Sequence, residues 1–453
     1  MNEKNRTMDL VNGPIAKTLI VFSVPFMLSM LLQTAYSTTD TIIVGQYLGS
    51  AGLSAVSNGS QLMQMLTALC IGFANAGQVL IAQAKGAGNY EKLEKIIGTL
   101  FVLEVFICVV IGTVCVVFSR GLLNILNTPA EAYVQARWYI MICGGGLIFT
   151  GLYNLFSAML RGMGDSRHPL LFVILATVLN VFLDILFIAG FNWNVAGAAL
   201  ATIIGQAVSV VFSLVFLLRH TREYGIDFSL KTMRPDAQST RQLFSIGAPM
   251  ALQLTAVQIS FLFVGRMINA LGVTVSAAFG VMQKIRMIPN FITSGFGQGA
   301  ASMMGQNLGA KKLDRVDKIV KLTILVTGIT YGFFVILYLT VPELLFRIFT
   351  QDETVLEFAA MTTLVLAIEA VAHTFMPACN SLVSAQGFVK LSFTVAILDA
   401  FLGRIFFCWL LGSFFGLGAF GYFLGYICGT YITSSIVLIY YLSGKWKKRA
   451  ALV

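Results

Sequence analysis

The sequence predicts an all-α integral membrane protein with twelve transmembrane helices, built as two six-helix repeats. Three observations lead to this fold class. Hydrophobic residues make up 57% of the 453 residues and charged residues only 11%, a balance that soluble globular chains do not show. Apolar runs long enough to cross a bilayer, which takes roughly 20 helical residues, recur along the whole chain. The sequence also matches itself when it is shifted by 223 or 224 residues.

Each expected helix is a continuous apolar run bounded by charged, Gly-containing or Pro-containing segments. No stretch between the runs is long enough for a separate soluble domain. The twelve runs cover 15–46, 53–83, 95–118, 131–160, 169–190, 195–218, 242–268, 274–305, 318–341, 355–386, 390–414 and 417–442.

The basic residues predict the orientation of these helices. With both termini on one side of the membrane, most of the 30 Lys and Arg residues fall on that side, and only Arg120, Arg137 and Arg347 lie in the opposite loops. By the positive-inside rule the basic side is cytoplasmic. We therefore expect a multi-pass cell-membrane protein with both termini in the cytoplasm, whose partner is the lipid bilayer. The net charge of +10 reflects this topology, and nucleic-acid binding is not expected.

The repeat divides the chain into halves. Pro25 corresponds to Pro249, and "AQAKGAGNYEKLEKI" (82–96) corresponds to "GQNLGAKKLDRVDKI" (305–319). We expect an N-terminal lobe over 1–218, a cytoplasmic linker over 219–241 and a C-terminal lobe over 242–453. Because each half has an even number of spans, both halves enter the membrane from the cytoplasm. Parallel six-helix repeats of this kind are typical of transporters whose pathway lies between the halves.

Two acids lie within the apolar runs of the first half, where a charged side chain costs roughly 2.5 to 3.5 kcal/mol. Asp40 and Asp184 each lie about 10 Å below the outer membrane surface at 1.5 Å per residue. Three further polar side chains reach a similar depth, and they are Tyr139, Asn180 and Thr202. We expect these five side chains to form one polar cluster inside the first lobe.

Such a cluster has a definite chemistry. Two carboxylates brought together in a low dielectric cannot both stay ionised. The pair therefore binds a proton, or a small hard cation such as Na⁺ held by carboxylate, amide and hydroxyl oxygens. Structural explanations also remain open, since Asp40 can cap a helix end and Asp184 can lie at a helix interface.

The second half does not repeat this cluster, because Asn180 corresponds to Arg404, Asp184 to Cys408 and Thr202 to Tyr426. Its intramembrane charges can neutralise one another, or some of the basic ones can contact substrate. These charged residues are Lys284, Arg286, Glu369, Asp399 and Arg404. His373 is expected to be a hydrogen-bonded packing residue.

The seven cysteines all lie in apolar runs, without a Cys-x-x-Cys pair or a neighbouring His. This pattern is typical of helix-packing residues. Neither a disulfide nor a metal site is expected from it, apart from a Na⁺ ion at the acid cluster.

The two repeats, Pro25, the "GQNLGA" motif and "LRGMGDSRHP" after the fourth span together resemble the multidrug and toxic compound extrusion (MATE) family over essentially the whole chain. The acids resemble the DinF-like branch, which implies that Asp40, Asn180, Asp184 and Thr202 form the coupling site. The NorM-like branch would place a Glu on the seventh helix, where this chain has Gln253 and Gln258. Glu369 leaves coupling through the second lobe open.

The resemblance implies an antiporter that exports amphipathic, often cationic, organic compounds while H⁺ or Na⁺ enters. One charge crossing 100 mV releases about 2.3 kcal/mol, so no ATP is required, and no Gly-x-x-x-x-Gly-Lys-Ser/Thr loop occurs. Pro25 is expected to bend the first helix as the cation binds and leaves. We expect a monomer with no catalytic residues and no cofactor besides the coupling ion. A flippase of lipid-linked saccharides is the alternative, and an enzyme or channel is disfavoured.

Overall fold

The computed structural model describes residues 8–125, 128–226, 234–449 and 451–452, and within these ranges the chain forms helices and no β-strand. Nine of the described helices are long and apolar enough to span a membrane, and the bent pair α4 (Ala130–Gly145) and α5 (Leu147–Gly162) forms another span with a 48° break. The longest, α1 (Ile15–Gly86), contains two of the expected spans, because Gly49 interrupts it with a φ of +63°. With α10 (Val273–Gly309), the twelve expected spans are all present.

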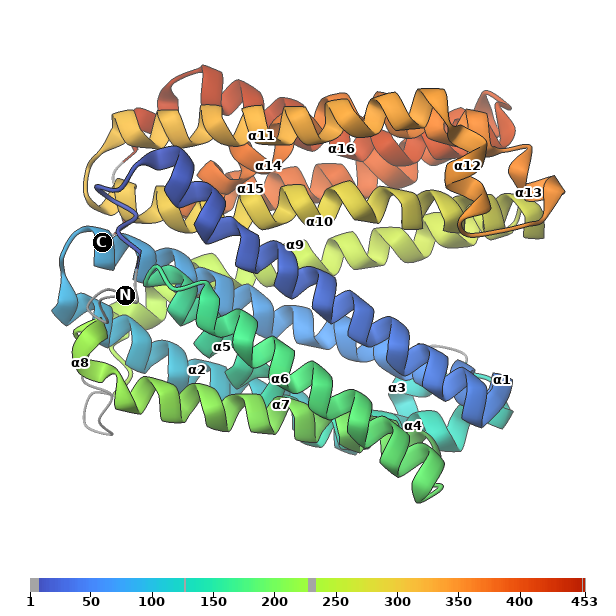
Figure 1. Ribbon diagram of the computed structural model, residues 1–453, viewed down its shortest axis with the longest axis horizontal. Helices are drawn as coiled ribbons and strands as arrows, with labels where there is room; N and C mark the ends of the chain where they lie inside the picture. Colours follow the sequence, from blue (N-terminus) through green and yellow to red (C-terminus); the bar gives the residue numbers. More distant parts are fainter. Residues whose placement is uncertain (1–7, 126–127, 227–233, 450, 453) are drawn as a thin grey trace. The chain divides into compact units, whose positions relative to one another are not determined.

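The chain forms two compact units. Most of the helices of the first half belong to unit 1, where α6 and α7 run antiparallel beside each other (Figure 1) and α2 packs on α4 and α5. Besides residues 28–86 of α1 and the α4 and α5 pair, its elements are α2 (Tyr90–Val117), α3 (Ser119–Ile125), α6 (Arg167–Asp184), the π-helix η1 (Ile185–Gly190), α7 (Asn194–Arg219) and α8 (Thr221–Tyr224).

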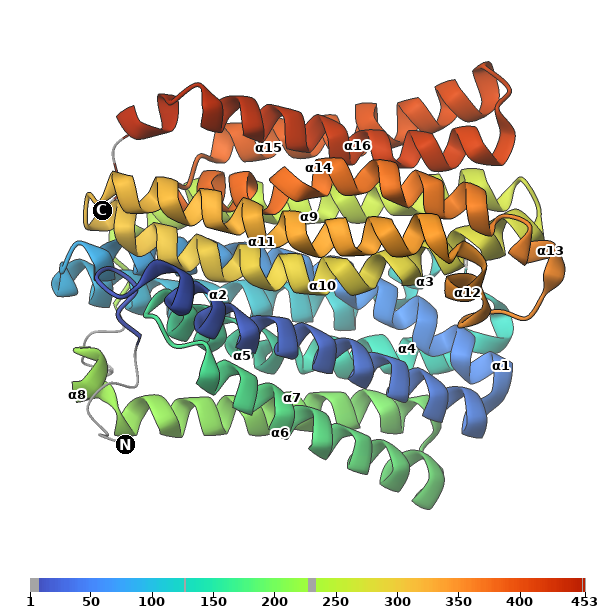
Figure 2. The same cartoon turned by 45° about the horizontal axis from the view of Figure 1, so that its top comes forward.

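Unit 2 contains most of the helices of the second half. In it α14 packs against α10, α11 and α16, and α10 and α11 lie side by side in Figure 2. Besides α10, its elements are most of α9 (Ala237–Asn269), α11 (Leu313–Thr340), α12 (Pro342–Arg347), α13 (Glu353–Leu356), α14 (Ala359–Ala385), α15 (Val389–Ile397), the π-helices η2 (Leu398–Phe406) and η3 (Cys408–Phe414), α16 (Gly418–Leu442) and the 3₁₀ turn η4 (Lys445–Lys448).

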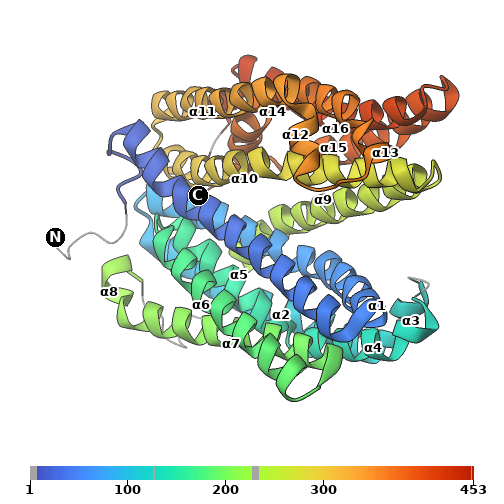
Figure 3. The same ribbon diagram turned by 45° about the vertical axis from the view of Figure 1, so that its right-hand side comes forward.

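The unit boundaries differ from the expected limits of 218 and 242. Residues 10–27, at the start of α1, belong to unit 2, and α9 belongs to unit 1 up to Ala251. Both boundaries fall two residues after a proline inside a helix, Pro25 in α1 and Pro249 in α9. A proline inside a helix removes a backbone hydrogen bond and kinks the helix, so the two parts of one helix can pack in different units. Figure 3 gives a second view of the long helix α1.

Glycines let the start of α1 pack closely in unit 2 and the start of α9 pack closely in unit 1. A Cβ atom on Gly72 would lie 2.5 Å from the Cα of Ala251, and one on Gly295 would lie 2.9 Å from the Cα of Met27. Gly72 and Gly295 are corresponding residues of the repeat, so each half uses the same position to receive the helix start of the other. No side chain fits at either contact without moving a backbone.

The motif "LRGMGDSRHP" holds the chain that follows α7. Asp165, in this motif, is buried and accepts hydrogen bonds from the hydroxyl of Tyr224 in α8 (2.6 Å) and from the backbone N–H of Arg167 (3.0 Å). The motif therefore attaches the first part of the expected linker to unit 1. Residues 227–233 of that linker lie outside the described residues.

Candidate functional site

A chain of hydrogen bonds links three helices of unit 1 at the level of the two expected acids. The hydroxyl of Tyr36 in α1 and Oγ1 of Thr202 in α7 are 3.1 Å apart and share a hydrogen bond. Nδ2 of Asn180 in α6 donates to the same Thr202 oxygen at 3.5 Å. Helices α6 and α7 can approach here because Gly205, less than one turn after Thr202, has no side chain against Asn180.

The structure brings Asp40 and Asp184 together beside these hydrogen-bonded side chains. Their carboxyl groups interact with each other, and Tyr36 interacts electrostatically with both. Asp40 is 8% exposed and Asp184 is fully buried. Asp184 is the last residue of α6 before the helix changes to the π-helical segment η1, a local widening that often occurs at functional sites.

Several oxygens of the cluster are buried without a hydrogen-bond donor among the described residues. They are Oδ1 of Asp40, both carboxyl oxygens of Asp184 and Oδ1 of Asn180. Buried acceptors without donors are costly, and all four are the oxygen types that hold a proton or a hard cation such as Na⁺. The residues present therefore fit the expected proton or cation.

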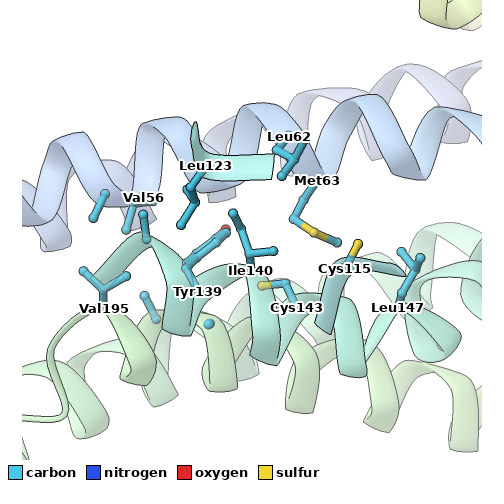
Figure 4. Close-up of a cluster of buried hydrophobic side chains, with 14 of the residues drawn as sticks. Val56, Leu62, Met63, Cys115, Leu123, Tyr139, Ile140, Cys143, Leu147 and Val195 are labelled. Atoms are coloured by element: carbon cyan, nitrogen blue, oxygen red, sulfur yellow. The ribbon is translucent and has the colours of Figure 1, made fainter. Parts of the chain in front are cut away.

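Tyr139 lies at the edge of this cluster. It interacts electrostatically with Asp40 and Tyr36, but its ring packs in an apolar cluster and contacts Gly59 of α1. Figure 4 shows the ring beside Ile140 and Cys143. Among the described residues no hydrogen bond joins Tyr139 to the acids, so its side chain supports the wall of the cluster, whereas Tyr36 belongs to the hydrogen-bonded polar group itself.

Sequence reasoning missed Tyr36. The signal was present, because Tyr36 lies four residues before Asp40 and thus on the same face of an α-helix. A tyrosine inside an apolar run is also a common packing residue, so the spacing alone did not single it out. Only the position of Thr202 on another helix shows that the hydroxyl points inward.

In unit 2 the buried charges form two neutral ion pairs. Arg286 in α10 binds both carboxylate oxygens of Glu369 in α14 with one edge of its guanidinium, at 2.9 Å from Nε and 2.8 Å from Nη2. Thr430 in α16 donates to the same carboxylate at 2.8 Å. His373 lies 3.4 Å from Glu369 Oε1, and its ring stacks on Tyr331.

The second pair joins Arg404 and Asp399 within η2, with distances of 3.2 and 3.0 Å. Tyr426 connects the two pairs, because its hydroxyl accepts from Arg286 at 2.8 Å while the Arg404 guanidinium lies 5.3 Å from its ring centroid. Asn180 and Thr202 occupy the corresponding repeat positions of Arg404 and Tyr426. The two halves thus use the same place for a cluster of buried oxygens and for a network of paired charges.

One expectation from the sequence is corrected here. Lys284 does not belong to the charge network: its side chain is exposed and makes no ion pair within the described part of the chain, because its position on α10 faces away from Arg286. Among the cysteines, which the sequence predicts to be helix-packing residues, Sγ of Cys70 and Sγ of Cys108 lie 3.7 Å apart. Residues 38 positions apart in sequence meet there because α1 and α2 are adjacent.

A family model supplies independent evidence on this chain. The model named MatE matches residues 25–186 and again residues 249–410. The chain belongs to the MatE family. The two matches begin at Pro25 and at Pro249, so they have the same offset as the internal repeat and confirm that the protein is built from two copies of one unit.

Curated relatives and solved structures agree with this assignment. The chain is 27% identical over 98% of both chains to "Probable multidrug resistance protein YpnP" of Bacillus subtilis. It is 26% identical to "Probable multidrug resistance protein NorM" of Thermotoga maritima, over 97% of this chain and 94% of the relative. Among solved structures, an outward-facing multidrug resistance MATE family transporter has a TM-score of 0.90 with 20% identity, covering 99% of this chain and 100% of the other. A mutant of the Vibrio cholerae transporter VcmN has a TM-score of 0.86 with 20% identity, covering 95% and 97%. These structures share the fold of this MatE protein.

Proposed function

We propose that this MatE protein is a cation-coupled antiporter that exports amphipathic, often cationic, organic compounds by alternating access. It resides in the cell membrane with both termini in the cytoplasm, and H⁺ or Na⁺ moves inward as the compound moves out. The observation that carries the proposal is the group of buried oxygens without donors on Asp40, Asn180 and Asp184. The multidrug resistance names of several relatives suggest the class of exported compound.

The coupling ion binds at Asp40 and Asp184, with Asn180 and Thr202 completing the oxygen set. Tyr36 orients Thr202 through their hydrogen bond. This set matches the acid pattern of the DinF-like branch. When the ion leaves, two carboxylates remain close together in a low dielectric, which is unfavourable, and the helix that carries Asp40 responds.

Pro25 provides the flexible point for that response. It lies fifteen residues before Asp40 in α1, close to the boundary where the helix passes from one unit to the other. A proline kink can change its angle because one intrahelical hydrogen bond is already missing. Movement of α1 about Pro25 then changes the surface that the first lobe offers to substrate.

The flippase alternative receives less support from the geometry. A diphosphate needs uncompensated positive charge, and both Arg286 and Arg404 are neutralised by buried carboxylates. Lys284 alone does not form a phosphate site. Because Glu369 is paired with Arg286, its carboxylate is less suited to bind a coupling cation, which disfavours coupling through the second lobe.

The test is transport by the Asp40→Asn variant in proteoliposomes, with ethidium as the exported probe. We expect ethidium efflux driven by a pH or Na⁺ gradient to fall to the level of empty liposomes, since the amide cannot take up and release a proton and binds Na⁺ weakly. A pH-sensitive dye and radioactive Na⁺ inside the vesicles identify the ion that moves.

The matched control is Asp352→Asn, which changes an acid that caps α13 outside the spans. This variant should transport like the original protein. Efflux by Asp40→Asn at the original rate, with intact folding in detergent, would contradict the coupling role of Asp40.

A further inference from the structure

A second group of buried side chains lies in unit 1 and takes no part in the proposed coupling. Cys70 in α1, together with Glu104 and Cys108 in α2, places two sulfurs and a carboxyl oxygen within 4.8 Å of one another. Glu104 and Cys108 are four residues apart and share one face of α2. All three residues are at most 2% exposed.

The carboxyl group of Glu104 is the unusual member of this group. Both of its oxygens are buried and have no hydrogen-bond donor among the residues that the structure describes. A buried carboxyl group without partners is costly in either protonation state. The carboxyl group of Glu104 interacts electrostatically with Cys70, and no ion pair joins it to a basic side chain among the described residues.

The separation of the two sulfurs is compatible with a shared metal ion. Two thiolates bound to one Zn²⁺ at about 2.3 Å with a tetrahedral angle lie about 3.8 Å apart, and the observed separation is 3.7 Å. Linear coordination, which some soft ions adopt, would place two such sulfurs about 4.6 Å apart with the same bond length. A disulfide would bring them to about 2.05 Å, and both cysteines are free thiols.

We propose that Cys70, Cys108 and Glu104 form a site for a thiophilic divalent cation, Zn²⁺ or Cd²⁺, that joins α1 to α2. The two thiols and the Glu104 carboxyl group release their protons to solvent when they bind the cation, so the occupied site carries one net negative charge. A carboxylate oxygen of Glu104 supplies the third protein ligand, and a water molecule completes four-coordination. Two sulfurs and one oxygen are a donor set that zinc accepts in proteins.

Gly151 of α5 closes the site from the third side. A Cβ atom at this position would overlap Sγ of Cys108 and would lie 3.2 Å from Oε1 of Glu104. The absence of a side chain at Gly151 therefore leaves room for the ligand atoms in an otherwise densely packed region. Among the residues that the structure describes, Cys115 and Cys143 belong to no comparable group of potential metal ligands.

The test measures binding of Cd²⁺ to the purified full-length protein in detergent. Thiolate ligation gives Cd²⁺ a charge-transfer absorption in the ultraviolet, and elemental analysis gives the stoichiometry. We expect one Cd²⁺ per chain, displaced by Zn²⁺, together with a higher melting temperature in the presence of the ion, since a ligand that binds the folded state stabilises it.

Three variants examine the ligands. Cys70→Ser and Cys108→Ser should lose the absorption band and the thermal shift, and Glu104→Gln should weaken Cd²⁺ binding by at least about 10-fold, the lower end of the loss for an outer-shell partner. The control is Cys379→Ser, which removes a buried free thiol of unit 2 and should bind like the original chain.

Two results would overturn the proposal. One is that the original protein, with its thiols reduced, takes up no Cd²⁺ or Zn²⁺. The contact between Cys70 and Cys108 would then be a simple thiol–thiol hydrogen bond. The other is Cd²⁺ binding that survives both Cys108→Ser and Glu104→Gln. If Cys108→Ser does not fold, Glu104→Gln keeps both thiols and decides the question alone.

Discussion

Tyr36 illustrates how a single hydroxyl group can organise the polar cluster of unit 1. Its bond to Thr202 joins α1 to α7, and Thr202 in turn accepts from Asn180 of α6. The side chains beside Asp40 and Asp184 are thus held in orientation by hydrogen bonds to one another. Groups that orient a ligand typically change the affinity of a site by about 10 to 100 fold when they are removed.

We therefore expect Tyr36→Phe to reduce the apparent affinity for the coupling ion about 10-fold while the maximal efflux rate and the melting temperature change little. The phenylalanine keeps the ring and loses only the hydroxyl. The measurement is ethidium efflux from proteoliposomes as a function of external H⁺ or Na⁺ concentration. The control is Tyr47→Phe, a change to an exposed tyrosine near the end of the same span. Equal ion dependence in both variants would show that the Tyr36 hydroxyl has no role.

Glu369 has a different role from the acids of unit 1, because every one of its interactions is with a donor or a cation. Arg286, Thr430 and His373 surround its carboxylate. Removing one member of a buried ion pair leaves the other charge unpaired, and such changes cost about 3 to 5 kcal/mol.

Glu369→Gln is accordingly expected to destabilise the protein by about 3 to 5 kcal/mol, measured as the loss of folded protein in thermal or denaturant unfolding in detergent. Glu343→Gln is the matched control, since Glu343 pairs with Arg347 at an exposed site and should leave the melting temperature almost unchanged. A Glu369→Gln variant that is as stable as the control but fails to transport would instead assign Glu369 to coupling.

Among the elements, the helices that contain the sites both include π-helical segments, although in the second half the change already begins at Leu398. The π-helical segment η1 begins after Asp184, and η3 begins at Cys408, the repeat equivalent of Asp184. In the second half η2 carries Asp399 and Arg404 as well. Wider turns displace side chains from the regular helical positions, so the repeat preserves a backbone irregularity even where the side chains differ.

Glycine contacts between helices give a prediction at this scale. Gly295→Ala should destabilise unit 2 by about 1 to 3 kcal/mol, because its Cβ would meet the backbone of Met27 and the helix start must move. Gly280→Ala is the control on the same helix α10. It has open space around it and should be neutral or more stable by up to about 1 kcal/mol. Equal melting temperatures for the two variants would contradict the close contact.

For the whole molecule, the start of α1 packs in unit 2 and the start of α9 packs in unit 1, with the change of unit two residues after Pro25 and Pro249. The segment before α1 is held in unit 2, where Asn307 Nδ2 donates to the carbonyl of Leu10 at 2.9 Å and Arg315 donates to the carbonyl of Gly13 at 2.6 Å. Asn307 and Arg315 belong to the repeated motif "GQNLGAKKLDR". The motif therefore anchors a chain end almost 300 residues away in the sequence.

Arg315→Ala should loosen this anchor. We expect faster amide hydrogen exchange in residues 14–27 of α1, with little change in residues 50–86 of the same helix, because only the first part packs in unit 2. Hydrogen exchange with mass spectrometry measures this difference. Lys318→Ala, which removes an exposed basic side chain on the same helix α11, is the control. Unchanged exchange in residues 14–27 would mean that the anchor contributes nothing.

The sequence by itself determined the membrane class, the twelve spans and the two repeats, because hydrophobic length and internal similarity are written along the chain. It also placed Asp40 and Asp184 at one depth, since a helix rises by a fixed 1.5 Å per residue. It could not determine which side chains meet across helices. The hydroxyl of Tyr36, the pairing of Arg286 with Glu369 and the exposure of Lys284 depend on how each helix is rotated.

Tertiary structure alone decided the exchange of helix starts and the meeting of Cys70, Glu104 and Cys108. Both depend on which helices are neighbours and how closely their backbones approach, at Gly72, Gly295 and Gly151. A glycine in a helix looks the same in the sequence whether it faces lipid or another backbone. Rotation and contact are set by packing over the whole unit, and no local pattern contains them.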